Sequence, residues 1–306
     1  MHNKILLVGG AIVDIMLKID SLPKKGDNIY ALPQKTVVGG CAINIANILK
    51  QFNVGYDLCM PLGTGSYSDL IKKEMALEHS SYKPIFVSKE QDCSYCMCFI
   101  EEDGERTFIS VEGIEKHFKK EWFDTINFDE YGYFYFSGYD LEGDNGLEIL
   151  KALHTLPTHV KIVFDAGPRI FFCDKERIDE LLSLHPIIHA NREEIVGLTN
   201  ISDPKDAALD LSCKTDNLVF ATLDKDGCFY ADAKHAKSDF IASDKVLQVD
   251  ATGAGDSHMA GILVGLLKNL DLNRSCIIAN KIAASIVQVV GAKATISDDI
   301  ISLASN

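Results

Sequence analysis

Residues 250–262 read Asp-Ala-Thr-Gly-Ala-Gly-Asp-Ser-His-Met-Ala-Gly-Ile. A strand-like apolar run over Lys245–Val249 precedes them, and an apolar helix is predicted to continue from them to about Leu267. The small residues Gly253-Ala254-Gly255 form the turn between these two predicted elements. Such a turn exposes backbone N–H groups at a helix N-terminus, where the positive end of the helix dipole favours an anion. The segment therefore predicts a strand, a glycine turn and a helix that together bind an anionic group.

Asp256 lies in the same turn, although its carboxylate repels the anion that the turn attracts. The combination suits phosphoryl transfer to an alcohol, in which the carboxylate takes the proton of the attacking hydroxyl. The amides of Gly253, Ala254 and Gly255 would then stabilise charge on the transferring group. The alternative is a tight turn whose Asp merely suits the helix dipole, and the segment alone leaves both interpretations open.

A second glycine cluster occupies residues 37–49, which read Val-Val-Gly-Gly-Cys-Ala-Ile-Asn-Ile-Ala-Asn-Ile-Leu. Gly39 and Gly40 allow a ligand to approach the backbone closely. Apolar residues at helical spacing predict a helix over Ile43–Phe52, and Asn44 falls in its first turn. The side-chain amide of Asn44 can face whatever the glycines admit. A plain strand-to-helix connection with Asn44 as a cap is the alternative.

The two glycine segments, in this order, resemble the two sequence motifs of the ribokinase (PfkB) family of carbohydrate kinases. The resemblance extends along nearly the whole chain: Asp14 follows a predicted strand over Ile5–Val8, as the family's substrate-binding Asp does. A bacterial subgroup of sugar kinases without an assigned substrate shares Gly-Gly-Cys-Ala, Gly-Glu-Arg-Thr-Phe and Tyr-Phe-Ser-Gly-Tyr, found here at 39–42, 104–108 and 135–139. The resemblance implies a ribokinase-like three-layer α/β/α fold with a mostly parallel central sheet and a small β-sheet lid.

The resemblance also implies roles for the matching residues, in an ATP-dependent kinase that phosphorylates a hydroxymethyl group of a small sugar or sugar-like alcohol. The implied general base is Asp256, and the implied anion hole is formed by Gly253, Ala254 and Gly255. The residues implied to bind the sugar are Asp14, Gly39, Gly40 and Asn44. Those implied to bind ATP and Mg²⁺ are Asn191, Glu194, Thr222, Gly227 and Asn280, with Glu194 near Mg²⁺ through water. Many relatives also bind a monovalent cation such as K⁺, and its implied ligands here are Asp250 and Thr252.

Some of these residues have structural alternatives. Glu194 could be a solvated residue of a first helical turn, and Asn280 could face solvent from an otherwise apolar helix. The segment Thr222-Leu-Asp-Lys-Asp-Gly227 resembles the family's nucleotide-binding Thr-Leu-Gly-x-x-Gly turn, but Asp224 stands where many relatives carry Gly. A carboxylate at that position would change how the ribose or the phosphates of the nucleotide are held.

The composition limits the function further. Apolar residues make up 47% of the 306 residues, which is enough for a buried sheet with helices on both faces. The 44 acidic and 30 basic residues give a formal charge of −14, which argues against nucleic-acid and anionic-membrane partners. An acidic protein that binds ATP must supply local positive potential from backbone dipoles and Mg²⁺.

The chain is expected to be a cytoplasmic protein. It shows no basic-then-apolar leader and no apolar run near the ~20 residues that span a membrane. The nine cysteines lie mostly in apolar segments and are expected to be reduced. The run that contains Cys93, Cys96 and Cys98 alternates like a strand, and no second Cys/His cluster completes a metal site with them.

Predicted strands and helices alternate along most of the chain, which indicates a parallel sheet with right-handed crossovers. The predicted strands are Ile5–Val8, Tyr56–Met60, Tyr133–Phe136, Lys161–Asp165, Ile187–Ala190 and Leu218–Leu223. The predicted helices, besides the two above, are Ser68–Glu78, Leu147–Leu156, Lys175–Leu184, Arg192–Leu198, Pro204–Cys213 and Asn273–Val290. Because ligands bind at the carboxyl ends of such strands, Asp14, Asn191 and Asp256 are expected to meet in one crevice.

Two stretches, 12–37 and 93–111, lack this pattern and are predicted to form the lid of a single domain spanning 1–306. The second stretch is predicted to be a hairpin that turns at Glu102-Asp103-Gly104-Glu105. Its apolar face, with Cys96, Cys98 and Ile100, needs a cover, which is either the chain's own domain or a second copy. The family favours the second copy, so a homodimer through the lid is expected.

Other functions remain possible from the sequence. A nucleoside kinase of the same family and a non-catalytic sugar- or nucleotide-binding regulatory protein are the alternatives to a sugar kinase. A dinucleotide-dependent oxidoreductase is suggested by Val8-Gly9-Gly10, but the third glycine and the ribose-binding acid are missing. Few basic residues lie near the sugar motifs, which disfavours a phosphosugar substrate, although Lys24, Lys25 and Lys35 weaken that exclusion.

Overall fold

The computed structural model describes residues 4–79, 82–102 and 104–305. Asp103, in the predicted hairpin turn, lies outside the described residues. In the described part of the chain, no helix combines the length and apolar character that crossing a membrane requires.

The main sheet contains nine strands within the described residues, in the order β13-β12-β11-β10-β9-β8-β1-β4-β5. Their bounds are β1 (Lys4–Val8), β4 (Gly55–Leu62), β5 (Tyr82–Val87), β8 (Tyr133–Ser137), β9 (Lys161–Asp165), β10 (Ile187–Asn191), β11 (Leu218–Thr222), β12 (Gly227–Asp232) and β13 (Lys237–Ala242). The strands from β5 to β11 are parallel, and β12 and β13 add antiparallel to the edge. The central strands are almost continuous apolar runs because both faces of the sheet are covered.

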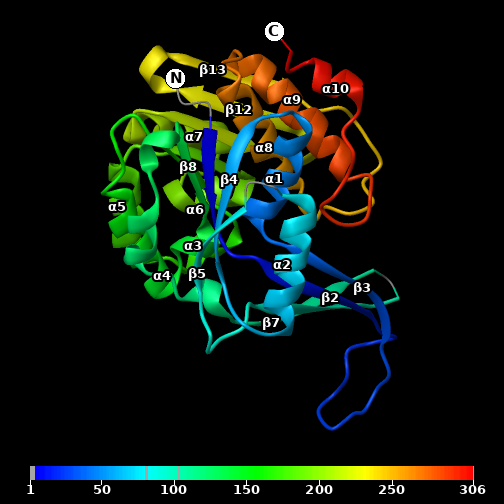
Figure 1. Cartoon of the computed structure of the whole chain (residues 1–306). Helices are drawn as coiled ribbons and strands as arrows, with labels where there is room; N and C mark the ends of the chain where they lie inside the picture. The colour runs from blue at the N-terminus through cyan, green and yellow to red at the C-terminus, as the bar shows by residue number, and fades with distance from the viewer. Residues whose placement is uncertain (1–3, 80–81, 103, 306) are drawn as a thin grey trace.

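Helices cover the main sheet on both faces, with α1, α8 and α9 on one side and α4 to α7 on the other (Figure 1). Their bounds are α1 (Cys41–Gln51), α2 (Ser66–Glu78), α3 (Gly138–Leu141), α4 (Gly143–Leu153), α5 (Lys175–Ser183), α6 (Arg192–Thr199), α7 (Pro204–Thr215), α8 (Ala254–Leu267), α9 (Leu272–Ile286) and α10 (Asp298–Ser302). Short 3-10 helices are η1 (Ile114–Lys116), η2 (Lys120–Thr125), η3 (Phe128–Glu130), η4 (Pro168–Phe172), η5 (Asp224–Asp226) and η6 (Ala233–His235). The architecture is the predicted three-layer α/β/α fold.

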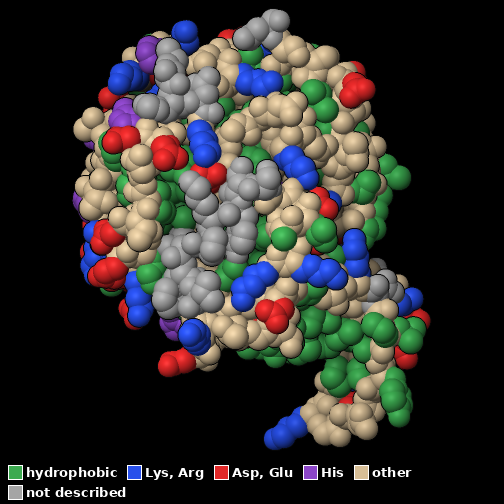
Figure 2. Space-filling model, in the orientation of Figure 1, with side chains coloured by type: hydrophobic (Ala, Val, Ile, Leu, Met, Phe, Trp, Pro, Cys, Tyr) green, Lys and Arg blue, Asp and Glu red, His purple; other side chains and the backbone are tan. Residues whose placement is uncertain are grey.

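A second, small sheet has the order β3-β2-β6-β7 and lies at one end of the main sheet (Figure 1). Its strands are β2 (Ile12–Lys18), β3 (Leu32–Gly39), β6 (Tyr95–Ile100) and β7 (Arg106–Val111). The connection between β2 and β3 extends away from the rest of the chain as a long exposed loop. Apolar side chains gather over this end of the molecule in Figure 2. They include the exposed side chains of Leu32, Phe108, Ile109 and Val111.

The structure differs from the sequence prediction over Lys245–Val249, which is not a strand. Its side chains face solvent, with Leu247 81% exposed, so the apolar run has no buried face to place on a sheet. The run is held instead where the amides of Val249 and Asp250 donate to the carbonyl of Val287, at 2.7 and 3.1 Å. That same carbonyl lies just beyond α9, which ends at Ile286 rather than at the predicted Val290.

Candidate active site

The two glycine clusters meet through Asn44 and Asp256. Asn44 Nδ2, in the first turns of α1, donates to Asp256 Oδ2 at 2.7 Å, although 212 residues separate the two. Asp256 is in the first turn of α8, and α1 and α8 pack side by side (Figure 1). Both helices therefore begin at the same place, and each contributes one polar side chain to it.

Burial raises the pKa of Asp256, and the nearby Asp165 carboxylate raises it further. Hydrogen bonds from Asn44 and from the Cys41 thiol oppose that rise, as does the positive potential of His189. A carboxylate with a raised pKa is a stronger base than a solvated one, so the environment suits proton abstraction. Cys41 was not predicted as a site residue; its position between Gly40 and the helix, in the Gly-Gly-Cys-Ala motif, was the available signal.

Gly253 is the N-cap of α8 and has a φ of +75°, a conformation that favours glycine. A Cβ at this position would lie 2.4 Å from Ala292 Cβ, so space also requires glycine. No side chain of the described residues caps the helix. The amide of Ala254 already donates to Ala251 O at 3.2 Å, whereas a Cβ on Gly255 would meet open space. The open side of the helix start is thus at Gly255, next to Asp256.

Asp14 lies inside strand β2 of the small sheet, paired with Val37 of β3 and Cys96 of β6. The sequence placed it after β1, within the stretch 12–37 predicted to form the lid, and in the structure it borders the glycine cluster from that small sheet. A Cβ built on Gly39 would lie 2.9 Å from Asp14 Oδ2. Burial raises the pKa of Asp14 to about 6.

Asn191 and Glu194 form a reciprocal cap at the start of α6. The Asn191 side chain accepts from the amides of Glu193 and Glu194, both at 2.9 Å, and Glu194 Oε2 accepts from the Asn191 amide at 2.8 Å. Glu194 is buried rather than solvated, and burial raises its pKa. The Asn-x-x-Glu motif therefore holds a helix N-terminus together, at the carboxyl end of β10. Thr222 ends the neighbouring strand β11 and is the register partner of Asn191.

The turn from Thr222 to Gly227 gives a physical reason for the family's glycine at position 224. Asp224 has a φ of +54°, in the left-handed region, which glycine adopts freely and Asp tolerates better than most residues. Its carboxylate and that of Asp226 each lie 3.4 Å from the Arg192 guanidinium.

A cavity of about 490 Å³ lies beside this turn. Its lining includes four basic side chains and two acidic ones, which leaves an excess of two positive charges: Arg192, Lys205, Lys225 and Lys245 against Asp203 and Asp226. This basic cavity at the carboxyl end of the parallel strands offers an acidic protein the local positive potential that a polyphosphate needs.

Asn280 is buried, and its polar atoms already have protein partners. Its Nδ2 donates to Ile241 O at 2.9 Å and to Ala242 O at 3.3 Å. Its Oδ1 lies 3.2 Å from His258 Nε2. The side chain therefore ties α9 to the end of β13 and to α8, and it does not face solvent.

A buried chain of polar groups continues inward from Asn280. His258 Nδ1 lies 3.0 Å from His189 Nε2, and His189 Nδ1 lies 2.8 Å from Asp165 Oδ1. Burial lowers the pKa of His189, but the Asp165 carboxylate outweighs burial and raises it overall. The sequence did not single out His189, His258 or Asp165, because they come from α8, β9 and β10 and meet only in the fold.

Asp250 and Thr252, the residues implied to bind a monovalent cation, instead contact an arginine. Arg106 of β7 donates through its two terminal nitrogens to Asp250 Oδ1 and Oδ2, at 3.0 and 3.1 Å. Its Nη1 also lies 3.1 Å from Thr252 Oγ1. The guanidinium holds the pKa of Asp250 well below its usual range, against the opposing effect of burial. These two side chains therefore do not fit a bound K⁺ in this structure.

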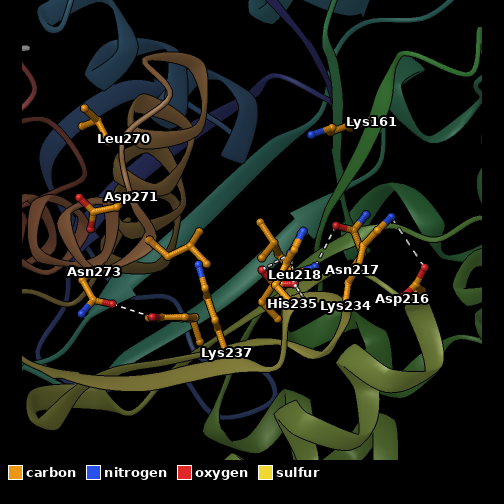
Figure 3. A pocket seen from close by; sticks show the side chains of 13 residues that line it. Lys161, Asp216, Asn217, Leu218, Lys234, His235, Lys237, Leu270, Asp271 and Asn273 are labelled. Atoms are coloured by element: carbon orange, nitrogen blue, oxygen red, sulfur yellow. Dashed lines mark hydrogen bonds and ion pairs between the residues drawn. The ribbon is translucent and has the colours of Figure 1, made fainter.

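Another cavity, of about 660 Å³, is lined by the residues drawn in Figure 3. Residues from the amino ends of strands line it, including Lys161, Asp216 and Asn217, and none of the predicted site residues does. Its charges of opposite sign face one another, as Lys234 does Asp216 at 3.9 Å, so the cavity presents no single charge to a ligand.

A model of the family described as pfkB family carbohydrate kinase matches residues 2–299. The chain is 30% identical over 297 residues to an uncharacterized sugar kinase of Escherichia coli, YegV, with 94% of this chain and 89% of that protein covered. It is 26% identical over 284 residues to a nucleoside kinase of Thermoplasma acidophilum, with 90% of this chain and 86% of that protein covered.

Solved structures show the same fold at lower identity. Ribokinase from Thermotoga maritima superposes with a TM-score of 0.82 at 21% identity, over 99% of each chain. A fructokinase with bound ATP from Xylella fastidiosa superposes with a TM-score of 0.78 at 16% identity, over 95% of this chain and 94% of that one. The predicted ribokinase-like fold is confirmed.

Proposed function

Because the chain belongs to the pfkB family of carbohydrate kinases, we propose that it transfers the γ-phosphate of ATP to a hydroxymethyl group of a small sugar or sugar-like alcohol. It is a sugar or nucleoside kinase, a phosphotransferase with an alcohol as acceptor. The contact that best supports the finer proposal is the 2.7 Å hydrogen bond between Asn44 and Asp256. It joins the implied sugar-binding residue to the implied base, so an acceptor held by one is within reach of the other.

In the proposed reaction the hydroxymethyl oxygen attacks the γ-phosphorus while its proton passes to Asp256. The bond between the γ-phosphorus and the β–γ bridging oxygen breaks, and ADP leaves with the electron pair. The free amides at the start of α8, beside Gly255, stabilise the charge on the transferring phosphoryl group. Asp256 and these amides lie in the same helical turn, which fixes the base relative to the phosphorus it serves.

The carboxylates of this region fit a magnesium ion held at a distance. Asp165 raises the pKa of both Glu194 and Asp256, so a divalent cation would relieve a repulsion that already exists there. Among the described residues, no three Asp, Glu, Cys or His side chains converge closely enough to ligate a metal directly. Mg²⁺ bound with ATP would therefore contact Glu194 through water, and its charge would screen the phosphates from Asp256.

The basic cavity beside Thr222 and Gly227 is the proposed site of the nucleotide phosphates. Reversing one of its charges with Lys225→Glu is expected to raise the KM for ATP about tenfold, because two units of charge change near the phosphates, worth about 1.4 kcal/mol. Lys175→Glu, an equal change at the exposed start of α5, is the matched control. Equal KM values for the two variants would place the phosphates elsewhere.

Asp14 is proposed to accept hydrogen bonds from hydroxyls of the acceptor. In the empty site its buried carboxylate lacks these partners, so its ionised form destabilises the fold. Because burial raises the pKa of Asp14 to about 6 in the folded chain, its ionisation destabilises the fold as pH rises through that value. Asp14→Asn is therefore expected to match the wild type in thermal stability below about pH 4 and to exceed it above pH 6. Denaturation midpoints across that range measure the effect, and equal midpoints at every pH would contradict it.

The acceptor class is tested by ADP release from Mg·ATP with a panel of pentoses, ketohexoses, phosphohexoses, polyols and nucleosides. A nucleoside acceptor is the second candidate, which the nucleoside kinase of Thermoplasma acidophilum supports through its 26% identity over most of the chain. Release with sugars or polyols only supports the proposal, release with nucleosides only supports the second candidate, and no release with any acceptor overturns both.

We also propose that two copies associate through the small sheet. Cys96 and Cys98 are buried within one chain, so the chain itself supplies part of the predicted cover. Phe108, Ile109 and Val111 of β7 remain exposed, and an apolar strand that faces solvent favours a partner surface. Light scattering should give twice the mass of one chain, and Ile109→Asp should give the mass of one chain.

A further inference from the structure

The carboxylate of Asp250 is buried and receives donors from three parts of the chain. The first is the loop itself, since Thr252 donates to Oδ1 through its amide at 3.0 Å and through its hydroxyl at 2.7 Å. The second is the amide of Gly291, which donates to Oδ2 at 2.9 Å. The third is Arg106 of the small sheet, which contacts both oxygens.

These donors occupy all the acceptor positions of the Asp250 carboxylate. An ionised Asp offers about four acceptor positions, and five hydrogen bonds already converge on Asp250. Thr252 Oγ1 is engaged twice, as a donor to Asp250 and as an acceptor from Arg106. A monovalent cation binds through oxygen lone pairs. Asp250 has none left to offer, and Thr252 Oγ1 keeps at most one, which is too few for these two side chains to hold the ion.

The guanidinium supplies the charge that such a cation would bring. The guanidinium carries one permanent positive charge. It is planar and can donate two parallel hydrogen bonds to the two oxygens of a carboxylate, whereas a metal ion carries charge without this directional match. Burial opposes that charge, but the hydrogen bonds to Asp250 raise the pKa of Arg106 above its already high value. Arg106 also belongs to Gly-Glu-Arg-Thr-Phe, the motif that the site described above leaves without a role.

We propose that Arg106 is a built-in replacement for the monovalent cation at the Asp250–Gly255 loop, so that this chain neither binds nor requires K⁺ there. The inference rests on the proposed kinase function for its effect on turnover, but not for its effect on cation binding. Because Arg106 comes from β7, the loop that precedes Asp256 receives its positive charge from the small sheet. Arg106 is thereby a positioning residue. It holds the loop through Asp250, while the amides at the start of α8 bind the transferring phosphoryl group.

The test compares the wild type with Arg106→Gln, which keeps polarity and removes the charge, in KCl, NaCl and choline chloride at equal ionic strength. Wild-type turnover is expected to be equal within twofold in all three salts. Arg106→Gln is expected to lose at least about tenfold in choline chloride and to regain most of that loss in KCl, because the emptied carboxylate becomes a cation site. Arg274→Gln, which removes another part-buried arginine from its carbonyl partners, should show no preference among the salts.

A binding measurement separates this inference from the proposed function. The thermal midpoint of Arg106→Gln is expected to rise by about 2–4 °C in 100 mM KCl relative to choline chloride, and that of the wild type to stay unchanged. If the wild type phosphorylates no acceptor, the proposed function fails while the midpoints still decide the cation question. A potassium-specific rise in the wild-type rate or midpoint overturns the inference. So does an Arg106→Gln chain that folds and is indifferent to K⁺.

Should Arg106→Gln fail to fold in choline chloride, refolding in KCl supports the inference and failure in both salts overturns it. Arg106→Lys adds a second measurement, since an ammonium keeps the charge but cannot contact both oxygens of Asp250 in the same way. It is expected to remain independent of K⁺ in its midpoint, and a potassium-specific rise equal to that of Arg106→Gln would contradict the role of charge.

Discussion

Asp256→Asn is expected to lower turnover by ~10²–10⁴-fold while ATP binding persists. The asparagine keeps the shape of the side chain and can still bond to Asn44, but it cannot take the proton of the attacking hydroxyl. Burial and the Asp165 charge raise the pKa of the native carboxylate, so its basicity, and not only its presence, contributes to the rate. ADP release measures turnover, and calorimetric titration with Mg·ATP measures binding. The expected pattern is a lost kcat with an affinity for ATP within a few fold of the wild type.

Asp298→Asn is the matched control, because Asp298 also lies in the first turn of a helix, α10, and is exposed. Both substitutions remove a favourable interaction with a helix dipole, which is worth well under 2 kcal/mol at such a position. Only Asp256 adjoins the two glycine clusters. Near-native turnover of Asp256→Asn would therefore show that Asp256 only stabilises the start of a helix, and it would contradict the proposed role as base.

Gly138→Ala is expected to destabilise the fold by about 3–5 kcal/mol, close to the upper limit for a single substitution. Gly138 follows β8 in the motif Tyr-Phe-Ser-Gly-Tyr, where α3 begins. A Cβ there would lie 1.7 Å from the carbonyl oxygen of Ala166, just beyond β9. That atom belongs to the backbone and cannot rotate away, so the carboxyl ends of two neighbouring strands must separate. Denaturant unfolding measures the loss.

Gly255→Ala makes the same chemical change at a position where the new methyl group meets nothing within 4 Å. Its free energy of unfolding should stay within about 1 kcal/mol of the wild type, since alanine suits a helix better than glycine. If Gly138→Ala were as stable as this control, the close approach to Ala166 would not be the reason for glycine in the motif.

The order of helices and strands was largely accessible from the sequence because most elements carry strong hydrophobic patterns. The helix after the glycine turn was predicted to end at about Leu267, where α8 ends, since it is apolar on almost every side. The strands β12 and β13 were missed, because they form an antiparallel edge with no helix between them to give the alternating pattern. Lys245–Val249 was wrongly predicted as a strand, since its apolar residues are exposed and no pattern of residues reveals a missing partner.

The candidate site was predictable in its residues but not in its contacts. Asn191 and Glu194 were identified through a resemblance, yet their spacing of three is also that of a capping box, a local signal that the sequence contained. The contact between Arg106 and Asp250 could not be foreseen, because 144 residues separate them and the pairing depends on how the small sheet docks. Local patterns define elements, whereas such pairings require the packed chain.

The buried row of hydrogen-bonded groups from Asp165 through His189 and His258 to Asn280 determines how many hydrogens these side chains must hold between them. Asn280 turns its amide nitrogen to two carbonyls, so its oxygen faces His258, and each of the three contacts then requires one hydrogen. Two neutral imidazoles supply only two, so three hydrogen bonds need one hydrogen more, which the raised pKa of His189 favours on that ring. Without that hydrogen, two lone pairs would face each other in the packed interior, either between the two imidazoles across 3.0 Å or between His189 and Asp165 across 2.8 Å, and the contacts of β10 with α8 or β9 would bear the repulsion.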